Sequence, residues 1–272
     1  MHGTAIENRK GESRSMKKIW ITSLAKDQKR VQQTMEMLKK YGLDANGHFW
    51  EDDLKQMKWL GPREPLTEPD TALWMILTDD EHLAAPDVRY GLSLLALSVQ
   101  GVRGNGFPLM MVHKGELPTA ESLPTPLQGA ALLKEDNPVL GAKIVAKANM
   151  PPKSETSEYR LDVYAMPRIG QWLEVGPADS EWTGAMVGAA GGEIDAHGVG
   201  PVGRLPEKAV LEYPMQGLKL TLGEREYTAW AVQNRLDPKT SYFVRVKGEP
   251  DSLVLGPLSE GDDAEVFVLN LK

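Results

Sequence analysis

The stretch Ala72-Leu-Trp-Met-Ile-Leu-Thr78, followed by Asp79-Asp80-Glu81 and then by Pro86-Asp-Val-Arg-Tyr-Gly-Leu92, decides the fold. Its apolar run predicts a buried strand, and the segment from Pro86 predicts the start of a helix. In an open parallel sheet, ligands bind beyond the carboxyl ends of the strands. We therefore expect a crevice after Thr78, with Gly91 one helical turn in and facing it. Glycine supplies no acid, base or nucleophile, so the pattern favours binding over catalysis.

Strands and helices alternate on both sides of this stretch, over residues 16–150. The expected strands cover residues 18–23, 48–50, 72–78, 107–112 and 129–133. The expected helices cover residues 27–41, 87–100 and 138–148. Apolar strands that alternate with helices are typical of a parallel sheet covered on both faces. The sequence thus predicts an α/β domain with a flavodoxin-like five-stranded parallel sheet.

Residues 158–272 follow a different pattern. The preceding segment, 151–157, has the composition of a linker. Beyond it, short apolar runs separated by Gly and Pro, without an amphipathic helix, predict an all-β sandwich or barrel. The expected strands cover residues 159–165, 172–175, 183–187, 209–213, 218–222, 227–232, 242–247, 253–255 and 266–271. The Gly-rich piece 184–192 lacks a βαβ context, and we interpret it as strand ends and tight turns.

Composition limits the classes of function. The 272-residue chain has no Cys, which excludes disulfides, thiolate zinc sites and Cys nucleophiles. Its apolar runs are shorter than the about 20 residues that cross a bilayer, so we expect no membrane partner and a cytoplasmic location. Residues 151–272 hold 12 Lys and Arg against 19 Asp and Glu, which argues against nucleic-acid binding. The five His are scattered, so we expect no metal site and no cofactor.

The first 15 residues are polar and lack apolar periodicity, so we expect a disordered leader. The codons for Lys10-Gly11-Glu12 could form a purine-rich ribosome-binding site a few codons before Met16. We therefore hypothesise that Met16 is the native start.

Three segments carry a resemblance to a known family. Trp20-Ile-Thr-Ser-Leu-Ala-Lys-Asp27 is similar to the first box of bacterial Toll/interleukin-1 receptor (TIR) domains, a strand ending in Ser and followed by a loop Asp. Ala85-Pro-Asp-Val-Arg-Tyr-Gly-Leu92 is similar in spacing to the family's Ser-Pro-Trp-Cys-x-x-Glu-Leu pattern. Phe107–Val112 with Leu123-Pro124 resembles the fourth strand and its Pro-containing loop. Residues 18–149 therefore resemble a TIR domain, and more loosely a nucleoside deoxyribosyltransferase-like domain.

The departure from this family concerns its catalytic acid. In TIR domains that cleave NAD, a Glu of this helix is the catalytic carboxylate, and Gly91 takes its place here. Glycosyl transfer needs a carboxylate near the developing oxocarbenium ion. The resemblance therefore implies no catalytic residue, with Asp79, Asp80 and Asp87 as fallback candidates for a displaced acid in an NAD glycohydrolase or nucleoside transferase.

The candidate ligand-binding residues lie where the strands are expected to end: Ser23, Asp27, Asp79, Asp80 and Arg89. Each has a structural alternative. Ser23 and Asp27 are also suited to capping the next helix, and Arg89 to the surface. The acidic run also suits a solvated loop with favourable charge near a helix start. Met57 and Trp59 either form an exposed anchor for self-association or pack their loop onto the sheet. Together these features predict a non-catalytic sensor or adaptor for a polar metabolite, nucleotide or protein, coupled to an acidic β-domain.

Overall fold

The computed structural model describes residues 16–152, 157–208, 210–258 and 265–272. The first part of the chain forms an α/β half. Its strands are β1 (Lys18–Ser23), β2 (Asp44–Phe49), β3 (Thr71–Asp79), β4 (Leu109–Lys114) and β5 (Ala131–Lys134). Its helices are α1 (Gln28–Lys40), α2 (Arg63–Thr67), α3 (Asp80–Ala84), α4 (Pro86–Arg103) and α5 (Leu140–Asn149). Short 3₁₀ turns cover Lys58–Leu60, Ala120–Ser122 and Thr125–Leu127.

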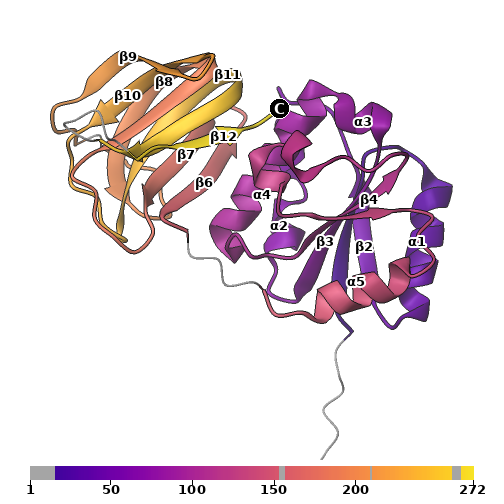
Figure 1. The fold of residues 1–272 in the computed structure, drawn as a ribbon. Helices are drawn as coiled ribbons and strands as arrows, with labels where there is room; N and C mark the ends of the chain where they lie inside the picture. The colour runs from indigo at the N-terminus through magenta and orange to yellow at the C-terminus, as the bar shows by residue number, and fades with distance from the viewer. Residues whose placement is uncertain (1–15, 153–156, 209, 259–264) are drawn as a thin grey trace, which may run out of the picture.

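The five strands form one parallel sheet in the order β2-β1-β3-β4-β5, as the sequence predicts (Figure 1). Helices cover both of its faces. Apolar residues of α1 and α5, such as Leu38 and Ile144, pack on one face with Ile21 and Met75. Helix α4 lies on the other face, where the core includes Trp74. This arrangement explains why strands that are apolar throughout alternate with helices of amphipathic spacing.

The rest of the chain forms a β half. Its strands are β6 (Tyr159–Met166), β7 (Gly170–Pro177), β8 (Ala185–Pro201), β9 (Met215–Leu222), β10 (Arg225–Val232), β11 (Thr240–Pro257) and β12 (Phe267–Asn270). They form a seven-stranded antiparallel sheet in the order β6-β7-β11-β8-β10-β9, and β12 pairs with β11. The expected all-β fold is confirmed. Among the described residues, the end strands β6 and β9 do not pair, so the sheet is not a closed barrel.

Two long strands replace the short ones that the sequence predicts. The runs 242–247 and 253–255 are parts of β11, which pairs with β8 on both sides of a register shift between Gly248 and Ser252. The Gly-rich piece 184–192 is not a set of tight turns, because most of it lies within β8. There Gly188 packs closely against Val254 and Ala229. The strand expected at 209–213 is also wrong for its described residues 210–213, which lie in a connection.

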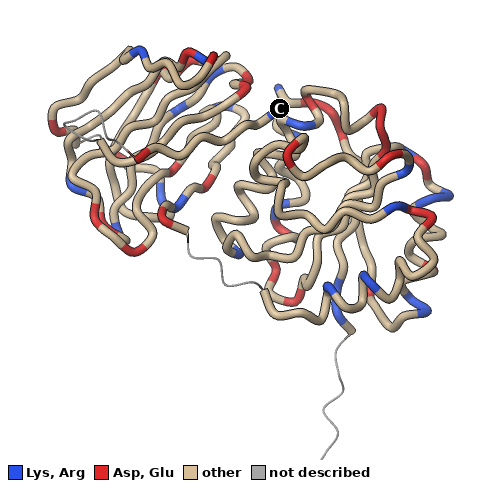
Figure 2. Tube along the Cα trace, viewed as in Figure 1, with Lys and Arg blue, Asp and Glu red and all other residues tan. Residues whose placement is uncertain are grey.

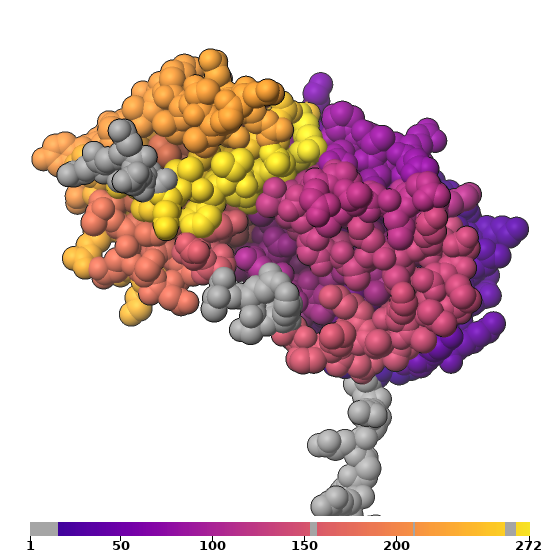
Figure 3. Space-filling view, in the orientation of Figure 1, coloured from indigo at the N-terminus to yellow at the C-terminus, as the bar shows by residue number. Residues whose placement is uncertain are grey.

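The two halves pack together along α4 and β6 (Figure 1). Helix α4 is buried around most of its circumference from Val88 to Val99, because the sheet lies on one side and the β half on the other. The C-terminus returns to this contact, where Ser93 Oγ donates to the Leu271 carbonyl at 2.8 Å. Figure 3 shows the C-terminal strand against the α/β half. One hydrophobic cluster thus extends through both halves.

Charged residues of both signs are interspersed over the described parts of both halves (Figure 2). No helix in the described ranges is both long enough and apolar enough to cross a membrane. The predicted leader 1–15 and residues 153–156 of the predicted linker lie outside the described residues.

Candidate functional site

The carboxyl edge of the parallel sheet holds the residues predicted to bind a ligand, but their polar groups serve the fold. Ser23 is fully buried, and its Oγ donates to the Ala25 carbonyl at 2.7 Å. Asp27 caps α1 by accepting from the Arg30 amide at 3.0 Å. The structural alternative therefore accounts for Asp27, whereas Ser23 closes its own turn rather than the helix.

The acidic run after β3 begins the short helix α3, and Asp80 and Glu81 are exposed in its first turn, as the alternative of solvated charge near a helix start predicts. Asp79 caps α3 and accepts from the His82 amide at 2.9 Å, with His82 Nδ1 at 2.7 Å. Burial raises the pKa of Asp79, but the hydrogen bonds from His82 outweigh it and leave the pKa below its usual value. Asp80 lies 2.9 Å from Nε2 of the buried His113. Both carboxylates therefore already have partners.

Two arginines connect loops to strand ends at this edge through hydrogen bonds. Arg89 donates to the Ser122 carbonyl at 2.5 Å and so holds the loop after β4. Arg30, which the sequence analysis missed, is buried and donates to the Thr78 carbonyl at 3.0 Å and to Glu135 at 2.7 Å. Its position in an exposed-looking helical stretch gives no sequence signal for that role. Both side chains thus join loops to strand ends.

Gly91 does not face an open crevice, which corrects the expectation from sequence. A Cβ built at Gly91 would lie 2.8 Å from Trp50 Cζ2 and 3.3 Å from Leu54 Cδ2. Trp50 is only 4% exposed, so its indole fills the space where a TIR-type acid would lie. The fallback Asp87 is exposed in the first turn of α4. The pKa of Asp52 is raised, first by partial burial and then by repulsion from Asp87, so these two carboxylates are neighbours.

The proposed anchor for self-association is wrong for Trp59. This side chain is 2% exposed and belongs to the core that α4 closes. Met57 is partly buried and packs against the same core. Of the two alternatives, the structure shows the packed loop, with the turn Lys58–Leu60 in contact with α4.

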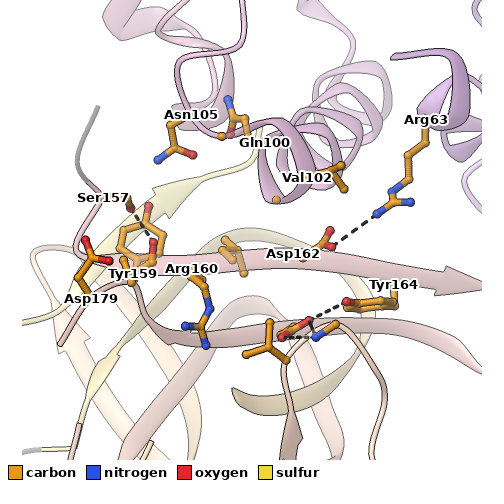
Figure 4. Close-up of a pocket in the computed structure, with 17 residues that line it drawn as sticks. Arg63, Gln100, Val102, Asn105, Ser157, Tyr159, Arg160, Asp162, Tyr164 and Asp179 are labelled. Carbon is orange, nitrogen blue, oxygen red and sulfur yellow. Dashed lines mark hydrogen bonds and ion pairs between the residues drawn. The ribbon is translucent and has the colours of Figure 1, made fainter. Parts of the chain in front are cut away.

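A hollow lies at the opposite end of α4, between the two halves. It is a cavity of about 820 Å³, within the range of small-molecule sites. Gln100 and Val102 border it from the end of α4, Asn105 from the segment that follows, and Tyr159 and Asp162 from β6 (Figure 4). The other lining residues are Arg63, Gly101, Gly104, Ser157, Arg160, Leu161, Tyr164, Glu174, Ala178, Asp179, Val202 and Gly203.

Of the two carboxylates in this cavity that are shielded from solvent, Asp162 has fewer partners than Glu174. It accepts from the Val163 amide at 2.7 Å, and Arg63 lies 3.5 Å away (Figure 4). Burial raises the pKa of Asp162 to about 6 despite these contacts. The carboxyl group also rests on α4, because a Cβ at Gly101 would lie 2.7 Å from its Cγ. A perturbed acid in a hollow is a recognised mark of a functional site.

The neighbouring charged groups, Glu174 and Arg160, are held by hydrogen bonds within the β half. Glu174 accepts from Tyr164 Oη at 2.7 Å, from Ser241 Oγ at 2.8 Å and from the Gly203 amide at 3.0 Å. Arg160 donates to the Thr240 carbonyl at 3.2 Å. Burial is the largest cause of the raised pKa of Tyr164. These groups form a rigid floor, which leaves Asp162 as the less constrained acid above it.

The sequence analysis missed this cavity. Its one local signal is the alternation in β6, where polar Arg160, Asp162 and Tyr164 occupy every second position. That pattern predicts a polar face of a strand but not what the face meets. Arg63 and Gln100 reach it from distant segments, and no spacing connects them to β6.

No family model matches the chain, and no curated protein matches it. The resemblance to TIR domains therefore stays a prediction. Among the residues that the structure describes, no group of three or more His, Asp or Glu side chains is arranged to hold a metal ion.

Proposed function

We propose that this chain is a non-catalytic, cytoplasmic sensor or adaptor that binds a small polar metabolite in the cavity between its halves. One observation carries the proposal. The carboxyl edge is filled by Trp50 in front of Gly91, whereas a cavity of about 820 Å³ lies at the other end of the same helix. Binding sites occur preferentially at such junctions between structural units.

The lining favours a ligand that donates hydrogen bonds or carries positive charge. Asp162, Glu174 and Asp179 supply three carboxylates against two guanidinium groups. Arg160 is occupied by main-chain carbonyls, and Arg63 lies beside Asp162. A ligand amine would offer Asp162 a charge-assisted hydrogen bond, and such bonds are roughly twice as strong as neutral ones. A nucleotide would offer an amino group too, but its phosphates would meet the carboxylates.

The position of the cavity supports a signalling role. A ligand there would touch α4 of one half and β6 of the other. A ligand shifts a conformational equilibrium only by its difference in affinity for the two states. One that bridges both halves favours the docked state, and in this way binding would be passed on as a change in how the halves associate.

Thermal unfolding of the full chain with putrescine, AMP and NAD tests the proposal. We expect putrescine to raise the melting temperature in a concentration-dependent way, since a ligand that binds only the native state stabilises it. Asp162→Asn should abolish that rise, and Asp179→Asn, at the exposed rim, should reduce it less. If none of the probes shifts the wild-type transition at millimolar concentration, the amine-binding role is wrong.

The enzymatic alternative is tested separately. Asp87 and its neighbour Asp52 are the carboxylates that could replace the family acid. We expect no release of nicotinamide from NAD and no exchange of deoxyadenosine, at protein concentrations high enough for assembly. Turnover that Asp87→Asn abolishes would reject the non-catalytic function.

A further inference from the structure

The outer edge of the parallel sheet is open at β2. In the order β2-β1-β3-β4-β5, this strand has one neighbour, and no other described strand pairs with it. The amides of Asp44 and Trp50 donate to Lys17 and Ser23 on the β1 side, at 3.0 and 2.8 Å. Backbone groups along a parallel ladder alternate in direction, so those of Ala45, Gly47 and Phe49 point away from β1. The Gly47 amide donates to Asn46 Oδ1 at 2.8 Å, so a strand that pairs at this edge has to replace that side-chain bond.

This edge lacks the usual protection against pairing. Natural edge strands are commonly blocked by Lys, Pro, bulges or shortness. Strand β2 has six residues, Asp-Ala-Asn-Gly-His-Phe, with no Lys, Arg or Pro and a continuous register along β1. The opposite edge, β5, has only four residues and carries Lys134, which pairs with Glu116. The two edges of one sheet therefore differ in their readiness to pair.

An apolar hollow of about 800 Å³ adjoins the open edge. Its apolar lining combines Val31 and Met35 of α1 with Ala45 and Phe49 of β2 and with Leu43 just before that strand. Its rim carries Gln28, Gln32, Glu36 and Lys39 from α1 and Asp44 from β2, with Met16 beside them. Burial of apolar side chains together with strand pairing is the combination that β-strand addition uses.

From this edge we infer that the chain forms a two-fold dimer in which β2 pairs antiparallel with β2 of a second copy, making a continuous ten-stranded sheet. A two-fold axis through Gly47 places Ala45 opposite Phe49 of the other copy, and Phe49 opposite its Ala45. A small residue thus faces a large one at both places. The same axis brings the uncharged Gln32 and Met35 of the two α1 helices together and leaves Glu36 and Lys39 at the flanks. A self-complementary patch of this kind is what an isologous interface requires.

Sedimentation velocity of the full chain tests the interface. We expect a concentration-dependent dimer between 5 and 100 µM, and Met35→Lys should raise its dissociation constant more than tenfold by placing like charges at the axis. Val139→Lys is the matched control, because Val139 is an exposed apolar residue near the opposite edge. A wild-type chain that stays monomeric at 100 µM overturns the inference, and so does a Met35→Lys chain that dimerises as tightly as the control.

Cross-linking identifies the surface independently of affinity. Because the chain has no Cys, a single introduced thiol reports only contacts between copies. The proposed pairing sets the two Asn46 positions diagonally across the axis, about 7–8 Å apart. A short bis-maleimide should link the Asn46→Cys chain into dimers and leave the Asn149→Cys chain, altered on exposed α5, monomeric. Equal yields from both would place the contact elsewhere, and capture of only a foreign strand-forming peptide would assign the edge to another partner.

Discussion

Helix α4 carries two glycines, and its surroundings differ sharply between them. Near the start of the helix, Gly91 faces the indole of Trp50, and the space is apolar and filled. Near its end, Gly101 faces the carboxyl group of Asp162 at the border of a large cavity with polar and apolar lining. Both glycines allow a close approach, but one approach completes a core and the other places an acid between the two halves. A glycine in α4 therefore does not by itself indicate which end of the helix binds a ligand.

The largest expected effect comes from emptying the closed end. Trp50→Ala removes a 4% exposed indole from a core that also includes Trp59 and Tyr90. Truncating a buried aromatic side chain leaves a cavity, and we expect a loss of about 4 kcal/mol in the free energy of unfolding. Denaturant unfolding measures it. Trp172→Ala, at a half-buried position, should cost clearly less, and equal costs would contradict the view that Trp50 fills a critical space.

Placing an acid at the closed end, where the TIR resemblance predicts one, should also destabilise the fold. Gly91→Glu would place its Cβ 2.8 Å from Trp50 Cζ2, so overpacking combines with an unpaired buried charge. We expect a loss of about 3 kcal/mol in unfolding free energy, without NAD cleavage. Gly129→Glu is the control, since a side chain there meets open space. A stable Gly91→Glu chain that cleaves NAD would show that Trp50 moves aside and that the edge is a latent active site.

Asp162→Asn tests the open end by its dependence on pH. The folded pKa of about 6 exceeds the usual value of 3.8, so the native state favours the protonated form. Its contribution to stability is full below about pH 4 and is lost as pH rises through 6. We expect Asp162→Asn to unfold with about 2 kcal/mol more free energy than wild type at pH 7, and the gain to shrink by pH 5. Urea unfolding at both pH values measures this. A gain that does not change with pH would mean that Asp162 is not charged within a desolvated site.

The parallel sheet could be predicted from sequence because each of its signals is local. The apolar run of β3 and the Pro86 start of α4 each act within a few residues. The long strands β8 and β11 could not be predicted, because Gly and Pro within them resemble turns. Their continuity comes from pairing with each other across the register shift at Gly248, which is a property of the whole sheet.

The candidate sites show the same contrast between local signals and long-range contacts. The position of Gly91 near the start of α4 could be read from Pro86, but the neighbour that fills its space follows β2, about 40 residues earlier. Likewise, the cavity combines Arg63, Gln100 and Asp162, which only the docking of the halves brings together. Local patterns predicted what each segment forms. What each segment meets depends on contacts between residues far apart in sequence.

The smallest expected effect concerns the carboxylates at the closed end. Asp27 and Asp79 each accept a hydrogen bond from an amide of the first helical turn, so Asp27→Ala should cost about 1 kcal/mol of unfolding free energy. Asp79→Ala should cost somewhat more, because His82 Nδ1 also lies 2.7 Å from its carboxylate. The pKa of Asp79 is lowered, so this extra cost is present at pH 7 and is lost as pH falls through the folded pKa. Unfolding at pH 7 and pH 3 measures both changes. Asp179→Ala is the control, because Asp179 lies at the cavity rim and caps no helix. If either cap variant removed the stabilisation by putrescine while Asp162→Asn kept it, the two ends of α4 would exchange roles, and the ligand would bind at the carboxyl edge after all.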